Sequence, residues 1–337
     1  MDGSVFMVNW KLIKDSATWA VLLKRFGDSQ HYMQAWSWGE HRSNFGWQPF
    51  RCVACGEDGR EIVLVQFLVR RLPGRIGIVW VPGGPIGDAD VWTETLLGAV
   101  KAISGLRQFV LKLNLLRPCH DGEVLSLRAF GWIRTSPPLT SALSMKWNLG
   151  TDVATRVSLT TKNWRHNLKR SEKYGLIVEC WKNPDPQEIA SLYGEMEQLK
   201  GLSEQVTREA AESMLSTLGA NLLIYRCLDV SGRMIALRAC VISDNQAWDL
   251  MAAAGSEARK VYASYATLWG MAQECHVRGV NLFDFSGVDP QNNKGVWDFK
   301  RGTGAQPIEY LGEWECATSE FLRKVINFMM RLRGVGG

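Results

Sequence analysis

One lysine that follows a carboxylate-bearing turn is the feature of this sequence that most strongly suggests chemistry. The apolar segment 280–285 carries Asp284 and ends in the turn at Gly287, and a polar loop then leads to Phe299 and Lys300. An acid, a glycine turn, a loop, an aromatic ring and a lysine in this order suggest a site that handles an amine or an acyl group. A lysine can stabilise the oxyanion of acyl transfer without being the base. Asp284 is a candidate base or the anchor of the loop.

A second carboxylate, Asp88, follows a glycine-rich turn at residues 81–87. Two prolines in this turn remove backbone donors that a phosphate cradle would need, so we interpret it as a shaped turn. For Asp88 the sequence favours a helix N-terminal cap over a catalytic base, although both remain open. The sequence has no nucleophile-elbow, P-loop or zinc-protease motif.

A loop that binds the pyrophosphate of coenzyme A would lie at residues 259–264, before a predicted long helix. Acyl-CoA enzymes place a glycine there so that pyrophosphate can approach backbone N–H groups closely. This chain has Tyr262 at that place and Ser264 at the last position of the loop. The sequence therefore disfavours coenzyme A, and we expect neither a cofactor nor a metal.

Positive charge surrounds a predicted helix at residues 162–174, where Trp164 and Arg165 lie among lysines and arginines and Glu172 is the one acid. Such a helix can meet the phosphates of RNA or of a nucleotide-linked substrate. The alternative is a solvated helix face, and the sequence does not separate the two.

The composition is that of a globular protein long enough for two domains. The chain has 337 residues, of which 46% are hydrophobic and 22% charged, with a formal net charge of +5. Its fifteen tryptophans can line a sugar or base platform, but most are expected in the core. The chain shows neither a secretory signal nor an apolar run that could span a membrane, so we expect a cytoplasmic protein.

The eight cysteines show no disulfide or zinc framework. Cys52 and Cys55 form the one close pair, and a structural zinc site would need a second pair at short spacing. We therefore expect reduced, structural thiols.

Hydrophobic periodicity predicts mixed α/β structure in both halves of the chain. In the first half, strands are expected at 50–54, 61–71, 75–81 and 109–115, and helices at 18–26 and 92–106. In the second half, strands are expected at 176–181, 221–229, 233–243, 246–253 and 280–285, and helices at 162–174, 186–200, 207–218 and 262–278. Each half shows a hairpin, a helix and a further strand in the same order, which predicts two similar α/β units.

A final amphipathic helix is predicted at residues 319–333. It could lie on a membrane surface, or it could pack on one domain and expose its basic side chains. We favour the second interpretation because packing is the common use of this pattern.

The sequence resembles the Fem (FemABX) family of non-ribosomal peptidyltransferases, which have tandem acetyltransferase-like (GNAT-like) domains. Members transfer an amino acid from aminoacyl-tRNA to the stem peptide of a cell-wall precursor. The resemblance rests on five segments in the same order: Gln34, Trp38 and Arg42; the turn 82–85; residues 165–179; residues 283–287; and Phe299, Lys300, Gly304 and Gly312. The sequence departs from the family at Arg42, where members have lysine, and at residues 200–215, where tyrosine is absent.

The resemblance implies two GNAT-like α/β domains with mixed sheets that share a cleft. Residues 1–150 would form the first domain and 151–316 the second, and the helix at 317–337 would pack back on the first. Lys300 would be catalytic, facing the acyl carbonyl or the acceptor. The implied substrate-binding residues are Phe299, which would shape that pocket, Arg42, near the diphosphate of the acceptor, and Trp38, Arg165, Asp88 and Asp284.

The function we expect is transfer of an aminoacyl group from aminoacyl-tRNA to an amine of a nucleotide- or lipid-linked envelope precursor of peptidoglycan type. Contact with the inner face of the membrane is compatible with such a substrate. The first alternative is an N-acyltransferase that uses acyl-CoA or another acyl thioester on an amino sugar or envelope polysaccharide. The second is a non-catalytic binding module with the same fold. The sequence leaves the amino acid, the acceptor and the oligomeric state open.

Overall fold

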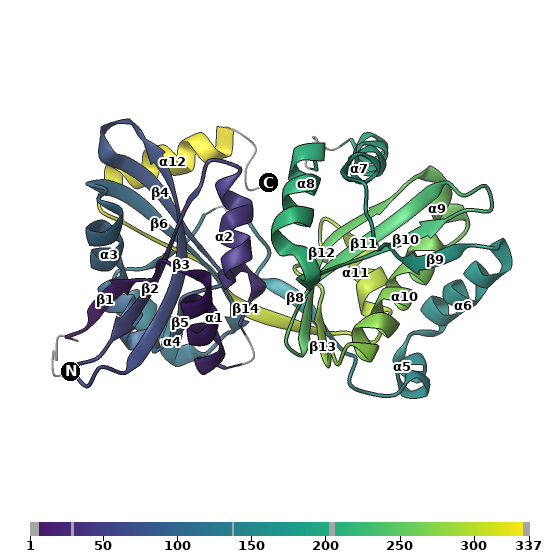
Figure 1. The fold of residues 1–337 in the computed structure, drawn as a ribbon, viewed down its shortest axis with the longest axis horizontal. Coiled ribbons are helices and arrows are strands. Elements are labelled where there is room, and N and C mark those ends of the chain that lie inside the picture. Colours follow the sequence, from purple (N-terminus) through teal and green to yellow (C-terminus); the bar gives the residue numbers. More distant parts are fainter. Residues whose placement is uncertain (1–6, 28–29, 137, 202–205, 333–337) are drawn as a thin grey trace. The chain divides into compact units, whose positions relative to one another are not determined.

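The computed structural model describes residues 7–27, 30–136, 138–201 and 206–332, and the chain divides into two compact units (Figure 1). The first unit is formed by Met1–Leu143 together with Glu309–Gly337, and the second by Ser144–Ile308. The chain thus leaves the first unit and returns to it near its end. Residues 333–337, which include the predicted end of the last helix, lie outside the described residues.

The first unit is built on a mixed sheet in the strand order β1-β2-β3-β4-β6-β14. Neighbouring strands are antiparallel except β4 and β6, which run parallel. Two short strands pair outside this path, β5 with β3 and β7 with β14. The strands are β1 (Asn9–Leu12), β2 (Gln48–Cys55), β3 (Glu61–Leu72), β4 (Ile76–Pro82), β5 (Ile86–Gly87), β6 (Gln108–Pro118), β7 (Ile133–Arg134) and β14 (Gln306–Ala317).

The parallel pair in the first unit requires a crossover, which α3 (Ala89–Ser104) supplies. Its apolar face, including Trp92 and Leu96, is buried in the core of the unit. The helix ends at Gly105, which takes the left-handed conformation common after a helix. The other helices of this unit are α1 (Ser16–Arg25), α2 (Trp36–Ser43), α4 (Asp121–Ala129) and α12 (Glu320–Leu332), and Tyr32–Gln34 and Pro73–Arg75 form 3-10 turns.

The second unit has the same plan. Its strand order is β8-β13-β12-β11-β10-β9, antiparallel except for the parallel pair β12 and β13. The long helix α10 (Ala263–Val277) makes the crossover between the parallel strands. The strands are β8 (Leu143–Asn148), β9 (Ile177–Cys180), β10 (Leu222–Leu228), β11 (Met234–Ser243), β12 (Gln246–Ala254) and β13 (Leu282–Asp284).

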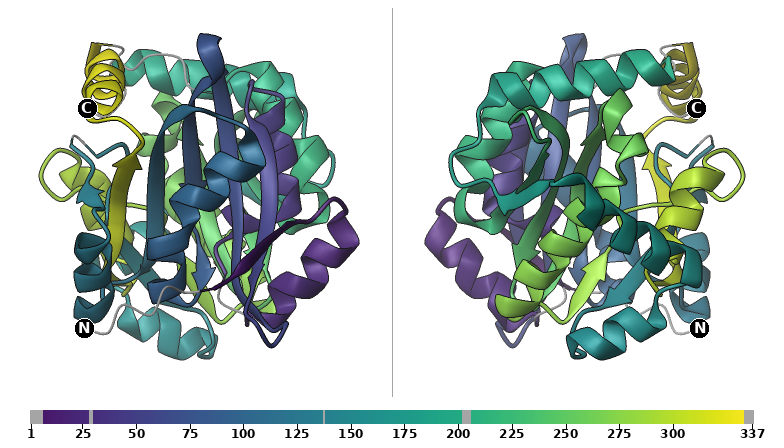
Figure 2. Two further views of the ribbon diagram at one scale, coloured as in Figure 1. Left: turned by 90° about the vertical axis from the view of Figure 1, so that its left-hand side faces the viewer. Right: turned by 90° about the vertical axis from the view of Figure 1, so that its right-hand side faces the viewer.

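Helices pack against the sheet of the second unit, with α6 (Lys162–Ser171) lying along α10 (Figure 2). A 3-10 turn at Glu172–Tyr174 continues α6 until Gly175 ends it in the left-handed conformation. The remaining helices are α5 (Val153–Leu159), α7 (Pro186–Lys200), α8 (Arg208–Leu218), α9 (Ser256–Lys260) and α11 (Lys294–Arg301), and Gly219–Asn221 forms a 3-10 turn.

The prediction of two similar α/β units is confirmed: each contains an antiparallel run of strands, a crossover helix and a parallel strand. The elements that the sequence did not predict include β1, β5, β7, α4, α5, α9 and α11. The most consequential of these is α11, which has a glycine, a β-branched valine and two aromatic rings among eight residues. Such a segment has weak helix propensity, so tertiary packing must hold it in place.

The described cysteines are free thiols. Cys52 lies buried in β2, and burial raises its pKa to about 12. A thiol with so high a pKa is inert as a nucleophile near neutral pH. Within the part of the chain that the structure describes, every helix is too short or too polar to cross a bilayer.

Candidate functional site

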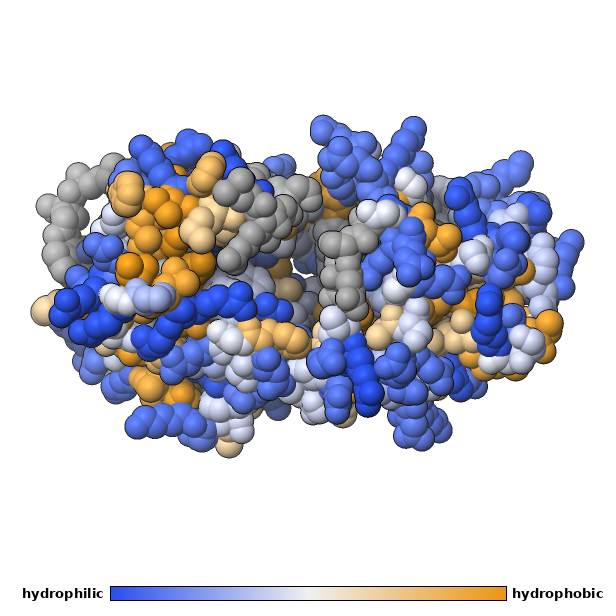
Figure 3. All heavy atoms as spheres, turned by 90° about the horizontal axis from the view of Figure 1, so that it is seen from above, coloured by the Kyte–Doolittle hydropathy of each residue, from blue (hydrophilic) through white to orange (hydrophobic). Residues whose placement is uncertain are grey.

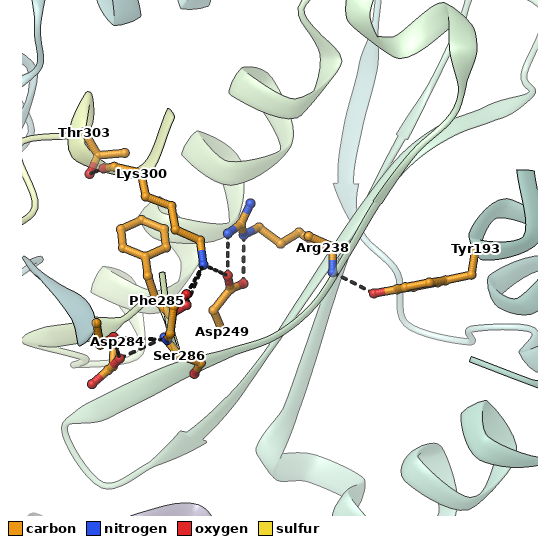
Figure 4. Close-up of polar contacts among 11 residues, drawn as sticks. Tyr193, Arg238, Asp249, Asp284, Phe285, Ser286, Lys300 and Thr303 are labelled. Carbon is orange, nitrogen blue, oxygen red and sulfur yellow. Dashed lines mark hydrogen bonds and ion pairs between the residues drawn. The ribbon is translucent and has the colours of Figure 1, made fainter. Parts of the chain in front are cut away.

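Lys300 points into the interior of the second unit, from the C-terminal turn of α11 (Figure 4). Lys300 is 8% exposed, and its Nζ atom donates to the carbonyl oxygens of Phe285 at 2.7 Å and Gly287 at 3.1 Å. The same Nζ lies 3.7 Å from Oδ2 of Asp249. Burial lowers the pKa of Lys300, and the negative charge of Asp249 partly opposes this effect. The ammonium group therefore bridges the turn after β13 and a buried carboxylate.

Asp284 holds that turn in shape. Its Oδ1 accepts from the backbone N–H of Ser286 at 2.8 Å and from the hydroxyl of Ser144 at 2.5 Å. The Ser144 oxygen in turn accepts from the backbone N–H of Gly287 at 3.3 Å. Ser286 has a left-handed backbone, with φ of 52°, which is uncommon for a residue with a side chain. These bonds direct two backbone carbonyls at Lys300.

Arg238 and Asp249 complete the charged cluster, and sequence reasoning missed both. Nε of Arg238 donates to Oδ1 of Asp249 at 2.9 Å, and Nη2 donates to Oδ2 at 2.5 Å. Both side chains are more than nine-tenths buried. Two cations and two carboxylates, those of Lys300, Arg238, Asp249 and Asp284, thus lie together inside one unit. The signal in the sequence is a charged residue in each of two otherwise apolar strands.

Aromatic rings form the surroundings of this cluster. The guanidinium carbon of Arg238 lies 5.6 Å from the ring centre of Phe285 and 5.8 Å from that of Phe299. Phe299 also contacts Tyr265 of α10 and Trp164 of α6. These rings lower the local dielectric constant, which strengthens the electrostatic effect of the buried charges.

Tyr193 supports β12, the strand that carries Asp249, from α7. Its hydroxyl accepts from the backbone N–H of Ala252 at 2.7 Å (Figure 4). Burial raises the pKa of Tyr193, so this hydroxyl stays protonated and neutral.

Arg165 and Asp88 are occupied by contacts that stabilise helix ends. Nη1 of Arg165 donates to the carbonyl oxygens of Val157 and Ser158 at 3.0 and 3.1 Å, at the C-terminal end of α5. Asp88 accepts from the backbone N–H groups of Asp90 and Val91 and caps α3. Of the two interpretations of Asp88, the structure shows the capping geometry.

Tyr262 lies in the loop 259–264, at the place where acyl-CoA enzymes have a glycine. This residue lies at the start of α10 with a left-handed backbone, φ of 61°, which is the conformation that a glycine would adopt most easily. The guanidinium carbon of Arg170 lies 4.6 Å from the ring centre of Tyr262. Tyr174 and Tyr265 also contact this ring. A half-buried aromatic side chain therefore stands where acyl-CoA enzymes leave the backbone open.

Trp38 and Arg42 come together in the first unit, one helical turn apart on α2. The guanidinium carbon of Arg42 lies about equally far from three ring centres, those of Trp38 (6.0 Å), Phe45 (5.9 Å) and Trp80 (5.7 Å). Burial and the positive charge of Arg70 lower the pKa of Arg42. Among the described residues, Arg42 Nε and Trp38 Nε1 are buried without a hydrogen-bond partner. These two N–H groups can still donate hydrogen bonds, and the guanidinium groups of Arg42 and Arg70 are positively charged. Together they are suited to binding an anion, and we call them the anion site of the first unit.

The predicted residues thus fall into separate groups. Lys300 and Asp284 belong to the charged cluster of the second unit, beside which Phe299 packs, whereas Trp38 and Arg42 lie together in the first unit. Within the described residues, no group of three or more His, Cys, Asp or Glu side chains is arranged to hold a metal ion.

A model of the FemAB family matches residues 228–331. The chain resembles the FemAB family. The matched segment contains the whole charged cluster of the second unit, from Arg238 to Lys300. No curated protein matches the sequence.

Solved structures show the fold of a tandem GNAT protein. A structure of FemX aligns over 95% of this chain and 100% of its own, with a TM-score of 0.81 and 14% identity. A tandem GNAT protein from the clavulanic acid pathway covers 93% of this chain and 99% of its own, with a TM-score of 0.60 and 12% identity. L-PGS from Bacillus licheniformis covers 96% and 98%, with a TM-score of 0.56 and 14% identity. With this fold, the FemAB match indicates an acyltransferase.

Proposed function

We propose that the protein transfers an aminoacyl group from aminoacyl-tRNA to an amine of a peptidoglycan-type cell-envelope precursor, in the cytoplasm. The observation that carries this proposal is that the FemAB match contains the buried cluster of Arg238, Asp249, Asp284 and Lys300. The aromatic residue next to Lys300, Phe299, packs beside the same cluster and would shape the pocket for the acyl group.

The reaction joins an amine to an ester that is already activated. The amine nitrogen attacks the ester carbonyl carbon, the carbonyl oxygen takes negative charge, and the bond to the ribose oxygen of the tRNA then breaks. The amine loses a proton and the ribose oxygen gains one. Lys300 would stabilise the developing oxyanion with a charge that Phe285 and Gly287 hold in place before the substrate arrives. Preorganised charge of this kind needs no reorganisation during the reaction.

Two observations support a tRNA donor over an acyl thioester of coenzyme A. Tyr262 occupies the place from which pyrophosphate would approach the backbone N–H groups of α10. The nearby helix α6 exposes the basic side chains of Lys162, Lys169 and Arg170, and Lys173 is exposed in the turn that follows the helix. None of these four takes part in an ion pair among the described residues, so their charges are available to phosphates.

The anion site of the first unit supports an acceptor that carries a diphosphate. Burial, with a smaller contribution from the charge of Arg70, lowers the pKa of Arg42, and neither arginine forms an ion pair with a described carboxylate. A guanidinium fork can bind phosphate oxygens with two bonds, and the Trp38 and Trp80 rings beside it can contact a base or sugar. Arg42 therefore takes the role of acceptor binding in this proposal.

A transfer assay with crude charged tRNA and a set of amine acceptors tests the function. We expect labelled amino acid to reach a nucleotide-linked peptidoglycan precursor, and RNase treatment to abolish the transfer. Transfer that survives RNase and depends on an acyl thioester would instead identify an N-acyltransferase. Conversion of no acceptor with either donor would identify a binding module.

A further inference from the structure

The last helix, α12, packs on the first unit through a face that mixes polar and apolar side chains. Asn327 donates to Oε1 of Glu315 in β14 at 2.7 Å and accepts from Nζ of Lys112 in β6 at 3.0 Å. Lys112 and Glu315 form a buried ion pair at 2.5 Å, and Nε of Arg323 lies 3.9 Å from the same glutamate. Among the described side chains of α12, Ile326 is the apolar one that is fully buried, at 3% exposure, and Leu322 and Met330 are half-buried.

A second set of apolar side chains on α12 faces outward, and we call it the α12 stripe. Phe321, Val325, Phe328 and Met329 are 76, 37, 62 and 48% exposed. Their spacing of four, seven and eight residues from the first places them on one side of a helix. The helix packs on the first unit and exposes Lys324 and Arg331, as the favoured interpretation expects, but it also exposes these apolar side chains, which that interpretation does not explain. In the view from above the first unit, hydrophobic residues gather over the region of α12 (Figure 3).

Positive charge borders the stripe. Lys324 and Arg331 are exposed, seven residues apart, on one flank of it. A second basic group lies at the tip of the β3–β4 hairpin, where Arg71 and Arg75 are exposed beside Leu72, itself 39% exposed. The backbone N–H of Arg107 binds the carbonyl of Arg75, which adds a third arginine to this group.

The two basic groups lie at the same end of the first unit. The backbone N–H of Phe109 at the start of β6 donates to Oγ1 of Thr318 just before α12, and Arg107 immediately precedes β6. Figures 1 and 2 show α12 and the hairpin tip at the upper end of this unit. An apolar stripe on a helix, bordered by cations and accompanied by an exposed leucine between arginines, has the chemistry of an interfacial membrane helix.

We propose that the α12 stripe and the β3–β4 tip dock on an anionic lipid surface. Phe321, Val325, Phe328 and Met329 would enter the boundary between headgroups and acyl chains, while Lys324 and the arginines would meet lipid phosphates. The positive charges of Lys324 and Arg331 beside the stripe favour an anionic lipid surface over a second copy of this chain. Two copies related by a two-fold axis would bring these like charges together.

Vesicle flotation tests this docking and does not depend on the transfer reaction. The full chain should float with vesicles of phosphatidylglycerol and phosphatidylcholine in equal parts, and should remain at the bottom with pure phosphatidylcholine. Phe328→Ser should weaken binding to the anionic vesicles about tenfold, since a largely exposed phenylalanine then no longer enters the lipid. Lys324→Glu should weaken it by a similar factor, and added salt should remove this difference.

Val230→Ser is the matched control, because Val230 is 82% exposed in a hairpin turn of the second unit. This variant should float like the parent protein. Equal loss in Val230→Ser and Phe328→Ser, or no flotation of the parent protein, would overturn the proposal. Self-association that Phe328→Ser abolishes, without vesicle binding, would show that a second copy covers the stripe instead.

Discussion

Arg238 and Asp249 form a two-bond ion pair inside the second unit because the pairing of β11 with β12 shifts between them. Ala239 pairs with Met251 while Cys240 pairs with Asp249, so Leu250 is an extra residue. In an unshifted ladder Asp249 would pair with Val241 and point to the opposite face from Arg238. The bulge brings the carboxylate onto the face of the arginine, as bulges near functional sites commonly do.

Asp249→Ala should destabilise the protein by about 3–5 kcal/mol, because it leaves the charges of Arg238 and Lys300 buried without their carboxylate. Urea unfolding monitored by tryptophan fluorescence measures this change. Glu257→Ala removes an exposed ion pair with Lys260 and should cost about 1 kcal/mol or less. Similar losses in the two variants would show that the buried cluster does not depend on Asp249.

Lys300→Ala should lower kcat/KM about 10²–10³-fold, the usual effect of removing one group that stabilises an oxyanion. Its partners Phe285 and Gly287 would lose their donor, so we also expect a loss of about 1–3 kcal/mol in stability. Lys294→Ala, at an exposed position of the same helix, should leave both quantities unchanged. Parent-like turnover in a folded Lys300→Ala protein would remove the catalytic role.

Arg42→Ala should raise the KM for a diphosphate-bearing acceptor about 10–100-fold, the value of one or two charge-assisted hydrogen bonds, with kcat little changed. Inorganic pyrophosphate should compete with the acceptor in the parent protein and much less in the variant. Arg25→Ala, which removes a largely exposed arginine paired with Glu61, serves as the control. An unchanged KM in Arg42→Ala would place the acceptor elsewhere.

His41 should make the stability of the protein fall as the pH drops from about 6.5 to about 4. Burial, with a smaller contribution from the charge of Arg42, lowers its pKa to about 4. In this window the unfolded chain binds a proton that the folded protein does not, so stability rises with pH, by about 3 kcal/mol in total. Urea midpoints should therefore depend less steeply on pH in His41→Gln than in the parent. Val230→Ser, which changes an exposed side chain without a titratable group, should keep the parent slope.

The sequence predicts the order of the elements well because most helices and strands carry their own periodicity and end signals. Gly175 and Gly105 end α6 and α3, for example, where a left-handed residue is needed. The helix α11 escaped prediction because its formation depends on distant contacts, such as Phe299 with Tyr265 and Lys300 with the turn after β13.

The charged cluster was only half predictable for a similar reason. Asp284 and Lys300 stand in a recognisable order of residues in the sequence. Asp249 becomes their neighbour through one unpaired residue in a strand, and alternation alone assigns it to the wrong face of the sheet. A local irregularity in backbone pairing therefore decides the charge balance of the site.

The return of the chain to the first unit has a consequence for biosynthesis. β14 pairs with β6 inside that unit's sheet, yet it begins at Gln306, at the end of the segment Ser144–Ile308 that forms the second unit. On the ribosome, the segment Met1–Leu143 therefore emerges with the β14 edge of β6 unpaired, while Ser144–Ile308 already holds every strand of its own sheet. Domains usually fold in the order of their synthesis. In this protein we expect the reverse order, because the second unit can finish first while the nascent first unit presents an open strand edge until β14 is made.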